Sequence, residues 1–141
     1  MIESARVVYA SEPELAVAEF RAVLVESGLG ATRPVDDEQR LQAMLSGASL
    51  LMTARLDAPD GRLVGVARCI TDFAWCCYLS ELAVSASAQA MGIGRRLLEE
   101  TRRHLGSRVS LILMSMPDVV GFYERAGMAR YPDTYWYKRE R

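Results

Sequence analysis

This 141-residue sequence lacks long hydrophobic runs, a signal pattern and an excess of either charge. No apolar stretch approaches the ~20 residues of a membrane span, and the stretch from Met1 to Arg6 lacks the basic-then-apolar order of a signal peptide. Lys and Arg number 17 against 18 Asp and Glu, a net charge of -1 that argues against an electrostatic nucleic-acid binder. We therefore expect a cytoplasmic protein that binds neither membranes nor nucleic acid.

Residues that bind metals or pair as disulfides are also scarce. His104 is the single histidine, and the three cysteines, Cys69, Cys76 and Cys77, have no spacing typical of a metal site. All three cysteines lie in strand-like segments, which predicts buried thiols in a reducing compartment. We expect no bound metal.

The length and composition suit one globular domain. Half of the residues are apolar and a quarter are charged, and no linker, repeat or low-complexity run interrupts the chain. The sequence predicts a single α/β (α+β) domain over residues 1–141.

Hydrophobic periodicity and turn residues divide the chain into alternating elements. Residues 11–14 have the capping chemistry of a helix start, Gly28 is expected to end this first helix, and Gly127 is expected to cap the last one. The first helix is expected to bury Leu15, Ala18, Ala22 and Val25, and the second Leu41, Met44 and Leu45. The predicted strands are 5–10, 49–57, 62–71, 75–85, 109–115 and 134–138, and the later helices are 36–46, 92–105 and 118–126.

Two glycines lie where the apolar run 77–84 gives way to an amphipathic helix, in the segment Gln89-Ala90-Met91-Gly92-Ile93-Gly94-Arg95. The first amides of a helix lack partners and carry about half a positive charge, which favours an anion. Glycines let a phosphate approach these amides closely. The alternative is that both glycines serve only a tight turn into a packed helix, and the signatures of a P-loop and of a dinucleotide fold are absent.

The order of motifs resembles the GCN5-related N-acetyltransferase (GNAT) superfamily. Gln89, Gly92 and Gly94 match its acetyl-CoA loop, Gln/Arg-x-x-Gly-x-Gly/Ala, and the segment from Val119 to Met128 is similar to its Phe-Tyr-Glu-Lys-x-Gly-Phe helix end. The resemblance extends from Leu63 to Tyr137. It implies a mixed, mainly antiparallel sheet flanked by helices, with acetyl-CoA as co-substrate.

The resemblance also implies the roles of particular residues. Tyr123 matches the tyrosine that protonates the departing thiolate, and its place beside Phe122 also permits a core aromatic residue with its hydroxyl at the surface. Glu81 is either the base for the amine or a structural or substrate-orienting carboxylate. Regular alternation would turn Glu81 away from the face of Ser80, unless a bulge exchanges the faces. The coenzyme would contact Leu82, Ala83, Val84, Gln89, Ala90, Met91, Gly92, Ile93, Gly94 and Arg95.

Many relatives carry Arg or Lys just after the glutamine, where this chain has Ala90 and Met91. Arg95 or Arg96 could supply the missing charge. The alternative is a solvated helix face with Glu99 and Arg103 paired, and for Arg96 this alternative is favoured.

The acceptor pocket is predicted only coarsely. By resemblance it involves residues 29–37, where Arg33 could bind an acidic group, and Asp72 could attract an amine. Each is equally well read as a solvated loop residue. An aromatic group is read either as part of this pocket or as core or dimer surface: Phe73, Trp75, Tyr135 and Trp136.

The function implied is an N-acetyltransferase that transfers acetyl from acetyl-CoA to a primary amine of a small molecule or peptide by direct attack. The alternative is a non-catalytic acyl-CoA-binding sensor or interaction domain. A different donor such as succinyl-CoA and a homodimer paired through terminal strands are both compatible with the resemblance.

Overall fold

The computed structural model describes residues 6–141. Five strands form one sheet in the order β1-β2-β3-β4-β5: β1 (Val7–Ser11), β2 (Leu50–Leu56), β3 (Leu63–Thr71), β4 (Cys76–Val84) and β5 (Ser110–Ile112). The first four strands pair antiparallel with one another, whereas β5 runs parallel to β4. The mixed, mainly antiparallel sheet expected from the sequence is therefore present. Residues 1–5, which include Ala5, where the first strand was predicted to begin, lie outside the described residues.

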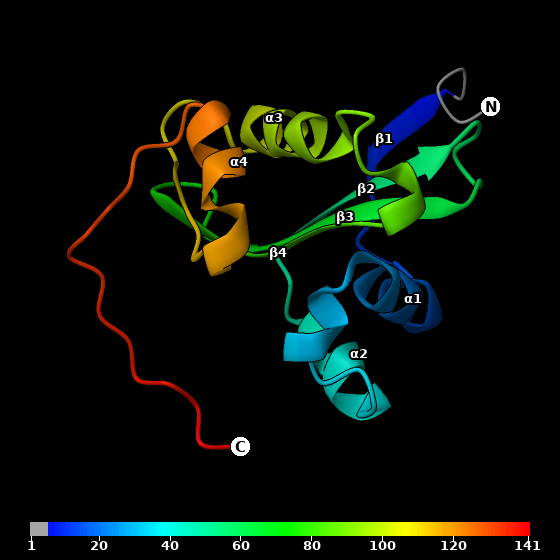
Figure 1. The fold of residues 1–141 in the computed structure, drawn as a ribbon, viewed down its shortest axis with the longest axis horizontal. Helices are drawn as coiled ribbons and strands as arrows, with labels where there is room; N and C mark the ends of the chain where they lie inside the picture. Colours follow the sequence, from blue (N-terminus) through cyan, green and yellow to red (C-terminus); the bar gives the residue numbers. More distant parts are fainter. Residues whose placement is uncertain (1–5) are drawn as a thin grey trace.

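Helices cover both faces of the sheet (Figure 1). On one face lies α3 (Ile93–Leu105), whose buried Ile93 and Leu97 join one hydrophobic cluster. The other face is covered by α1 (Val17–Ser27) and α2 (Glu38–Ser46), whose Phe20 and Leu41 belong to a second cluster. Short 3₁₀ turns, η2 (Leu29–Thr32), η3 (Ala86–Ala88) and η4 (Pro117–Val119), connect these elements, and η4 leads into α4 (Val120–Arg125).

The start and the buried face of α1 differ from the prediction. The helix begins at Val17 with no side-chain cap, because Ser11, the first residue of the predicted capping segment, is instead the last residue of β1 and lies opposite Met52 of β2. The buried residues are Phe20, Val23 and Leu24, whereas Val25 is 57% exposed. Leu15 is buried as predicted, although it precedes the helix, whereas the predicted burial of Ala18, Ala22 and Val25 is wrong. Gly28 ends the helix in the left-handed conformation as expected.

Residues 134–138 do not form the predicted last strand, and Tyr135 is 92% exposed. The C-terminal segment instead runs away from the sheet (Figure 1). Alternating β-prone residues indicate a propensity, but a strand needs a paired neighbour to be stable. Strand β5 is likewise shorter than predicted, at three residues, whereas Gly127 has the predicted left-handed conformation (φ +92°).

A bulge in β4 decides which side chains face which layer. Arg68 of β3 is opposite Glu81, but the next residue, Cys69, is opposite Leu79, so that Ser80 is the additional residue. Leu79 therefore packs with the α3-side cluster, while Ala83 packs with the α1-side cluster. The bulge that would exchange the two faces of β4 around Glu81 is therefore present.

The remaining expectations concern thiols, metals and membranes. Cys69 and Cys77 are buried as predicted, but Cys76 is exposed, and all three are free. Across residues 6–141 no cluster of metal-ligating side chains occurs. Nor does this part of the chain contain a helix with the length and apolarity needed to cross a bilayer.

Candidate active site

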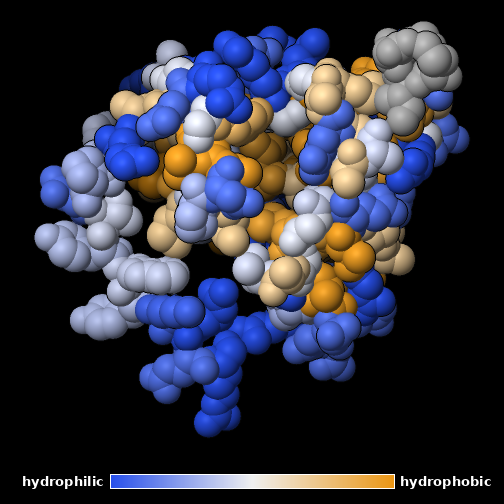
Figure 2. All heavy atoms as spheres, in the orientation of Figure 1, coloured by the Kyte–Doolittle hydropathy of each residue, from blue (hydrophilic) through white to orange (hydrophobic). Residues whose placement is uncertain are grey.

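A cleft of about 700 Å³ opens where β4 and β5 diverge. The two strands pair only over Cys76–Tyr78 and Ser110–Ile112, and beyond this point the edge of β4 has no strand partner among the described residues. Residues from the start of α3, from the loop between α1 and α2, and from α4 line the opening. Seen in Figure 2, the outer side of α3 is hydrophilic, while hydrophobic residues gather below it in the middle of this face.

The start of α3 presents backbone amides to this cleft. Gly92 is the N-cap, in the left-handed conformation (φ +78°), and no side chain caps the helix. The first helical hydrogen bond runs from Arg96 N–H to the Gly92 carbonyl at 3.1 Å, so the amides of residues 93–95 precede it. A Cβ at Gly92 would have no atom within 4 Å, whereas one at Gly94 would meet the Phe122 ring at 3.3 Å. Gly94 therefore also serves the packing of α4 on α3.

The loop before these glycines is held back against β4. The side-chain amide of Gln89 donates to the Val84 carbonyl at 3.0 Å, so that Gln89 fixes the loop to the end of the strand. Ala90 lines the cleft with φ +73°, a left-handed conformation that costs an alanine roughly 1–2 kcal/mol. Met91 does not line the cleft, and its side chain packs against the α3-side core.

Three consecutive residues of β4, Leu82, Ala83 and Val84, line the cleft together with Ile93. Leu82 and Val84 pack on the α3-side cluster, and Ala83 is buried on the opposite side. Unpaired strand edges offer N–H and C=O groups for pairing with an extended ligand. With the amides of α3, this edge gives the cleft two sets of backbone groups.

Glu81 is buried beneath the cleft rather than in its lining. It accepts hydrogen bonds from Arg33 Nε at 2.6 Å, from Ser80 Oγ at 2.8 Å and from Arg68 Nε. Burial opposes ionisation of Glu81, but the hydrogen bonds and charges of Arg68 and Arg33 outweigh it and hold the pKa of Glu81 below its usual value. Because the two arginines stabilise its charged form, the Glu81 carboxylate is a poor proton acceptor.

Arg33 links the loop after α1 to the β4 bulge. Besides Glu81, it donates through Nη2 to the Ser80 carbonyl at 2.8 Å and through Nη1 to the Thr32 carbonyl and hydroxyl. Four of its five N–H groups are thereby occupied. The idea that Arg33 binds an acidic acceptor group is not supported by this arrangement.

Tyr123 of α4 lines the cleft and is half-buried. Its ring packs edge-on against Phe122, with centroids 5.0 Å apart. Burial raises the pKa of Tyr123 above its usual value near 10, so that its phenol is protonated at neutral pH. The phenol is therefore available as a proton donor.

Arg95 and Arg96 occupy different environments. Arg96 lies 5.1 Å from the Tyr9 ring centroid and pairs with Glu100 at 3.0 Å, as expected for a solvated helix face. Arg95 lines the cleft and is held only loosely by Glu99, at 3.8 Å. The predicted pairing of Glu99 with Arg103 is wrong, because Arg103 instead pairs with Glu100.

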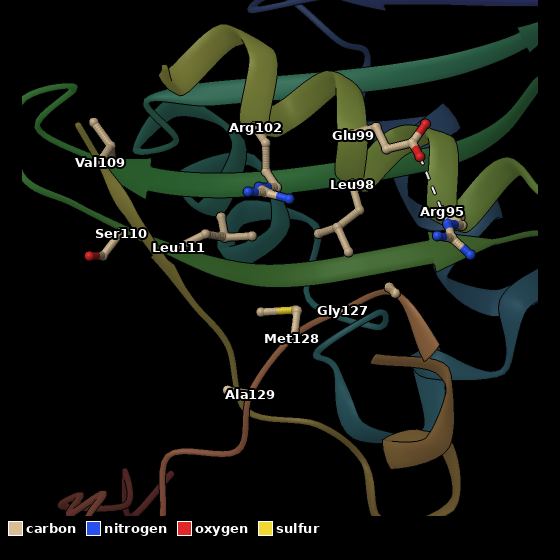
Figure 3. A pocket seen from close by; sticks show the side chains of 11 residues that line it. Arg95, Leu98, Glu99, Arg102, Val109, Ser110, Leu111, Gly127, Met128 and Ala129 are labelled. Atoms are coloured by element: carbon tan, nitrogen blue, oxygen red, sulfur yellow. Dashed lines mark ion pairs between the residues drawn. The ribbon is translucent and has the colours of Figure 1, made fainter. Parts of the chain in front are cut away.

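A second pocket, of about 500 Å³, lies on the flank of α3 (Figure 3). It is formed by one side of α3, by the start of β5 and by the segment after α4. Arg95 lines both this pocket and the cleft, and it is the residue through which the two adjoin.

Only some of the residues predicted to form the acceptor pocket line the cleft. Residues 29 and 31–33 line the cleft, whereas none of the four aromatic residues proposed for this pocket does. Asp72 accepts hydrogen bonds from the amides of Ala74 and Trp75 at 2.9 and 2.8 Å, so it fixes its own turn. Sequence reasoning missed Met114, Met116 and Asp118, because the segment after β5 matches no motif; Arg68 was missed because one arginine in a strand carries no signal.

Comparison with known proteins assigns this architecture. The profile of the "Acetyltransferase (GNAT) family" matches residues 18–128, well over half of the chain. An uncharacterised N-acetyltransferase of Pyropia yezoensis is 27% identical over 109 residues, which cover 72% of this chain and 62% of the relative. A rice (Oryza sativa subsp. japonica) protein named serotonin N-acetyltransferase 2, chloroplastic, is 33% identical over 103 residues, covering 71% of this chain and 52% of the relative.

The chain thus spans less than two thirds of the length of these relatives. Among solved structures, the aminoglycoside N-acetyltransferase AAC(6')-Iy in complex with CoA superposes with a TM-score of 0.71 at 14% identity. The superposition covers 97% of both chains, and at this identity it establishes a shared fold.

Proposed function

The chain belongs to the acetyltransferase (GNAT) family, and from this premise we propose that it is an N-acetyltransferase that transfers acetyl from acetyl-CoA to a primary amine of a small molecule or peptide. The names of both sequence relatives are consistent with this activity. The acceptor amine is the nucleophile and attacks directly.

One observation supports the proposal above all: a single cleft is lined by the start of α3, by the open edge of β4 and by Tyr123. The cleft suits a long thioester with a diphosphate. The amides of residues 93–95 are free of helical partners, and the space beyond Gly92 is open. We assign the diphosphate to the amides from Ala90 to Arg95 and the extended arm to the edge of Leu82–Val84.

Bound acetyl-CoA supplies the activated acyl group as a thioester. The amine nitrogen bonds to the acyl carbon, the carbon–sulfur bond breaks, and the electron pair leaves on sulfur. Tyr123 then donates its proton to this sulfur and recovers one from water. The amine releases its own proton to water.

In this proposal Glu81 is a positioning residue and not the base. Its carboxylate holds Arg33 and Arg68, and Arg33 in turn holds the loop after α1 on the β4 bulge. The loop and the bulge both line the cleft, so this network fixes the acceptor side against the thioester.

A non-catalytic acyl-CoA sensor is the second candidate. The observation that favours it is the absence of a basic side chain directly after Gln89, where Ala90 stands. In that case the cleft would bind the coenzyme without turnover, and Tyr123 would be only a packed aromatic residue.

Thiol release from acetyl-CoA in the presence of a panel of amines separates the two. The enzyme proposal expects amine-dependent release that falls at least a hundredfold in Tyr123→Phe, with coenzyme affinity unchanged. Coenzyme binding without release on any amine, unaltered in Tyr123→Phe, would favour the sensor.

We propose that residues 1–141 form a single domain, which one cooperative calorimetric transition would support. A cytoplasmic location is proposed as well, although the rice relative is named chloroplastic. A homodimer is proposed, and light scattering during size exclusion would test it.

A further inference from the structure

The cleft has two halves, and on the coenzyme placement proposed above only one of them is left for the acceptor. The coenzyme half lies along Leu82–Val84 and the start of α3. Leu29 and Ala31 of η2 line the other half with Met114 and Met116. Leu113 packs on the α3-side cluster, whereas Met114 and Met116 line the cleft.

Carboxylates are nearly absent from the cleft. Among the described lining residues, Asp118 is the one acid, against Arg33, Arg95 and Arg125. Behind the wall, Glu81 is flanked by Arg33 and Arg68, so that this buried group carries a net positive charge. A substrate with several ammonium groups would need several carboxylates and would instead meet repulsion.

The acceptor half offers apolar side chains instead. Met114 is 49% exposed, Met116 38% and Val119 of η4 40%. Exposed apolar groups gathered in a concave site are typical of ligand contact. Thioether side chains adapt to irregular shapes and contact aromatic ring edges favourably.

We propose that the acceptor is a monoamine whose single primary amine is attached to an apolar, ring-bearing body. The ring lies against Met114 and Met116, and the amine lies toward the β4 bulge. The net positive charge of the Arg33, Glu81 and Arg68 group disfavours an ammonium ion there, so the amine binds in its neutral, nucleophilic form without a dedicated base. This proposal rests on the proposed function and adds the substrate class.

The test measures thiol release at saturating acetyl-CoA with four amines. These are 2-phenylethylamine and tryptamine as ring-bearing monoamines, and spermidine and kanamycin as polycations. The expected kcat/KM is at least tenfold higher for the two monoamines than for either polycation.

A negative charge introduced into the acceptor half tests the apolar contact, and the same charge introduced outside the cleft serves as its control. Met116→Glu is expected to lower kcat/KM for tryptamine about tenfold, which corresponds to one thioether–ring contact. It should raise kcat/KM for spermidine and leave the KM for acetyl-CoA unchanged. The control Val25→Glu adds the same charge on the exposed side of α1, outside the cleft lining, and should change neither value.

The outcomes separate this inference from the proposed function. Thiol release that is as fast or faster with polycations, or that Met116→Glu does not alter, would overturn the monoamine assignment while leaving the acetyltransferase standing. Release on other amines of the wider panel but on neither monoamine would overturn the monoamine assignment alone, whereas coenzyme binding with release on no amine of the panel would overturn both.

Discussion

Replacing Glu81 by glutamine distinguishes a positioning carboxylate from a catalytic base. The change keeps the shape of the side chain but removes the charge between Arg68 and Arg33. Arg68 is only 7% exposed, so its guanidinium is left buried without a counter-charge. Breaking a buried pair in this way costs about 3–5 kcal/mol. For a domain of this size we expect the melting temperature to fall by roughly 10–15 °C.

The kinetic consequence is opposite in the two interpretations. A positioning role predicts that kcat, measured well below the transition temperature, falls less than about tenfold in Glu81→Gln. Loss of a general base would lower kcat by about 10²–10⁴. A fall of a hundredfold or more with a melting temperature within 2 °C of wild type would refute the positioning account.

Two further measurements sharpen this experiment. Glu99→Gln makes the same chemical change at an exposed residue loosely paired with Arg95 and should alter stability by less than about 0.5 kcal/mol. In the Glu81→Gln background, Arg68→Met should recover part of the lost stability, because it removes the uncompensated charge.

The pH dependence of stability tests the direction of the pKa shift of Glu81. The pKa of Glu81 is lower in the folded than in the unfolded protein, so its stabilising effect is present above the unfolded value near 4.3. The effect disappears as the pH falls through the folded value. The stability difference between wild type and Glu81→Gln, followed by urea unfolding, should therefore be full at pH 7 and shrink below about pH 4.

The other predictions address single features of the cleft. Because burial raises the pKa of Tyr123, the activity of the wild type should not fall from loss of this proton below about pH 10, and a Tyr123-dependent decline near pH 8 in the pH–rate profile would contradict its role. Ala90→Gly should stabilise the protein by about 1 kcal/mol in thermal unfolding by relieving the left-handed strain, and an unchanged or lower melting temperature would argue against that strain. Arg95→Gln should weaken acetyl-CoA binding several-fold in calorimetry, whereas Arg96→Gln should not, and equal effects would remove the distinction between the cleft-lining and the solvated arginine.

Local patterns predicted the part of the fold that local chemistry determines. The hairpin of β2 and β3, helix α3 and the caps at Gly28 and Gly127 follow from alternation, helical spacing and left-handed glycines. Most of the cleft-lining residues near α3 belong to one continuous motif, so the sequence also located them.

What the sequence did not predict depends on contacts between distant residues. The position of Ser80 as the additional residue of the β4 bulge depends on its register with β3, which local alternation does not contain. Ser11, predicted to start a helix, instead extends β1 because it pairs with Met52 of β2, a contact that local capping chemistry does not contain. The pairing of Arg33 with Glu81 spans 48 positions and turns a candidate base into part of a buried network.

The central claim is that the glycine-lined start of α3 binds the diphosphate of acetyl-CoA. A calorimetric titration of acetyl-CoA into wild type, Gly94→Ala and Gly94→Glu tests it most directly, with Val25→Glu as the charge control. The account predicts binding to wild type and the control, and a loss of a few-fold or less in Gly94→Ala. It predicts a loss of at least a hundredfold in a folded Gly94→Glu, because the longer side chain starts beside Phe122 and Val84 of the cleft and adds negative charge where we assign the phosphates. Undiminished binding to Gly94→Glu, or no binding to wild type, would contradict it.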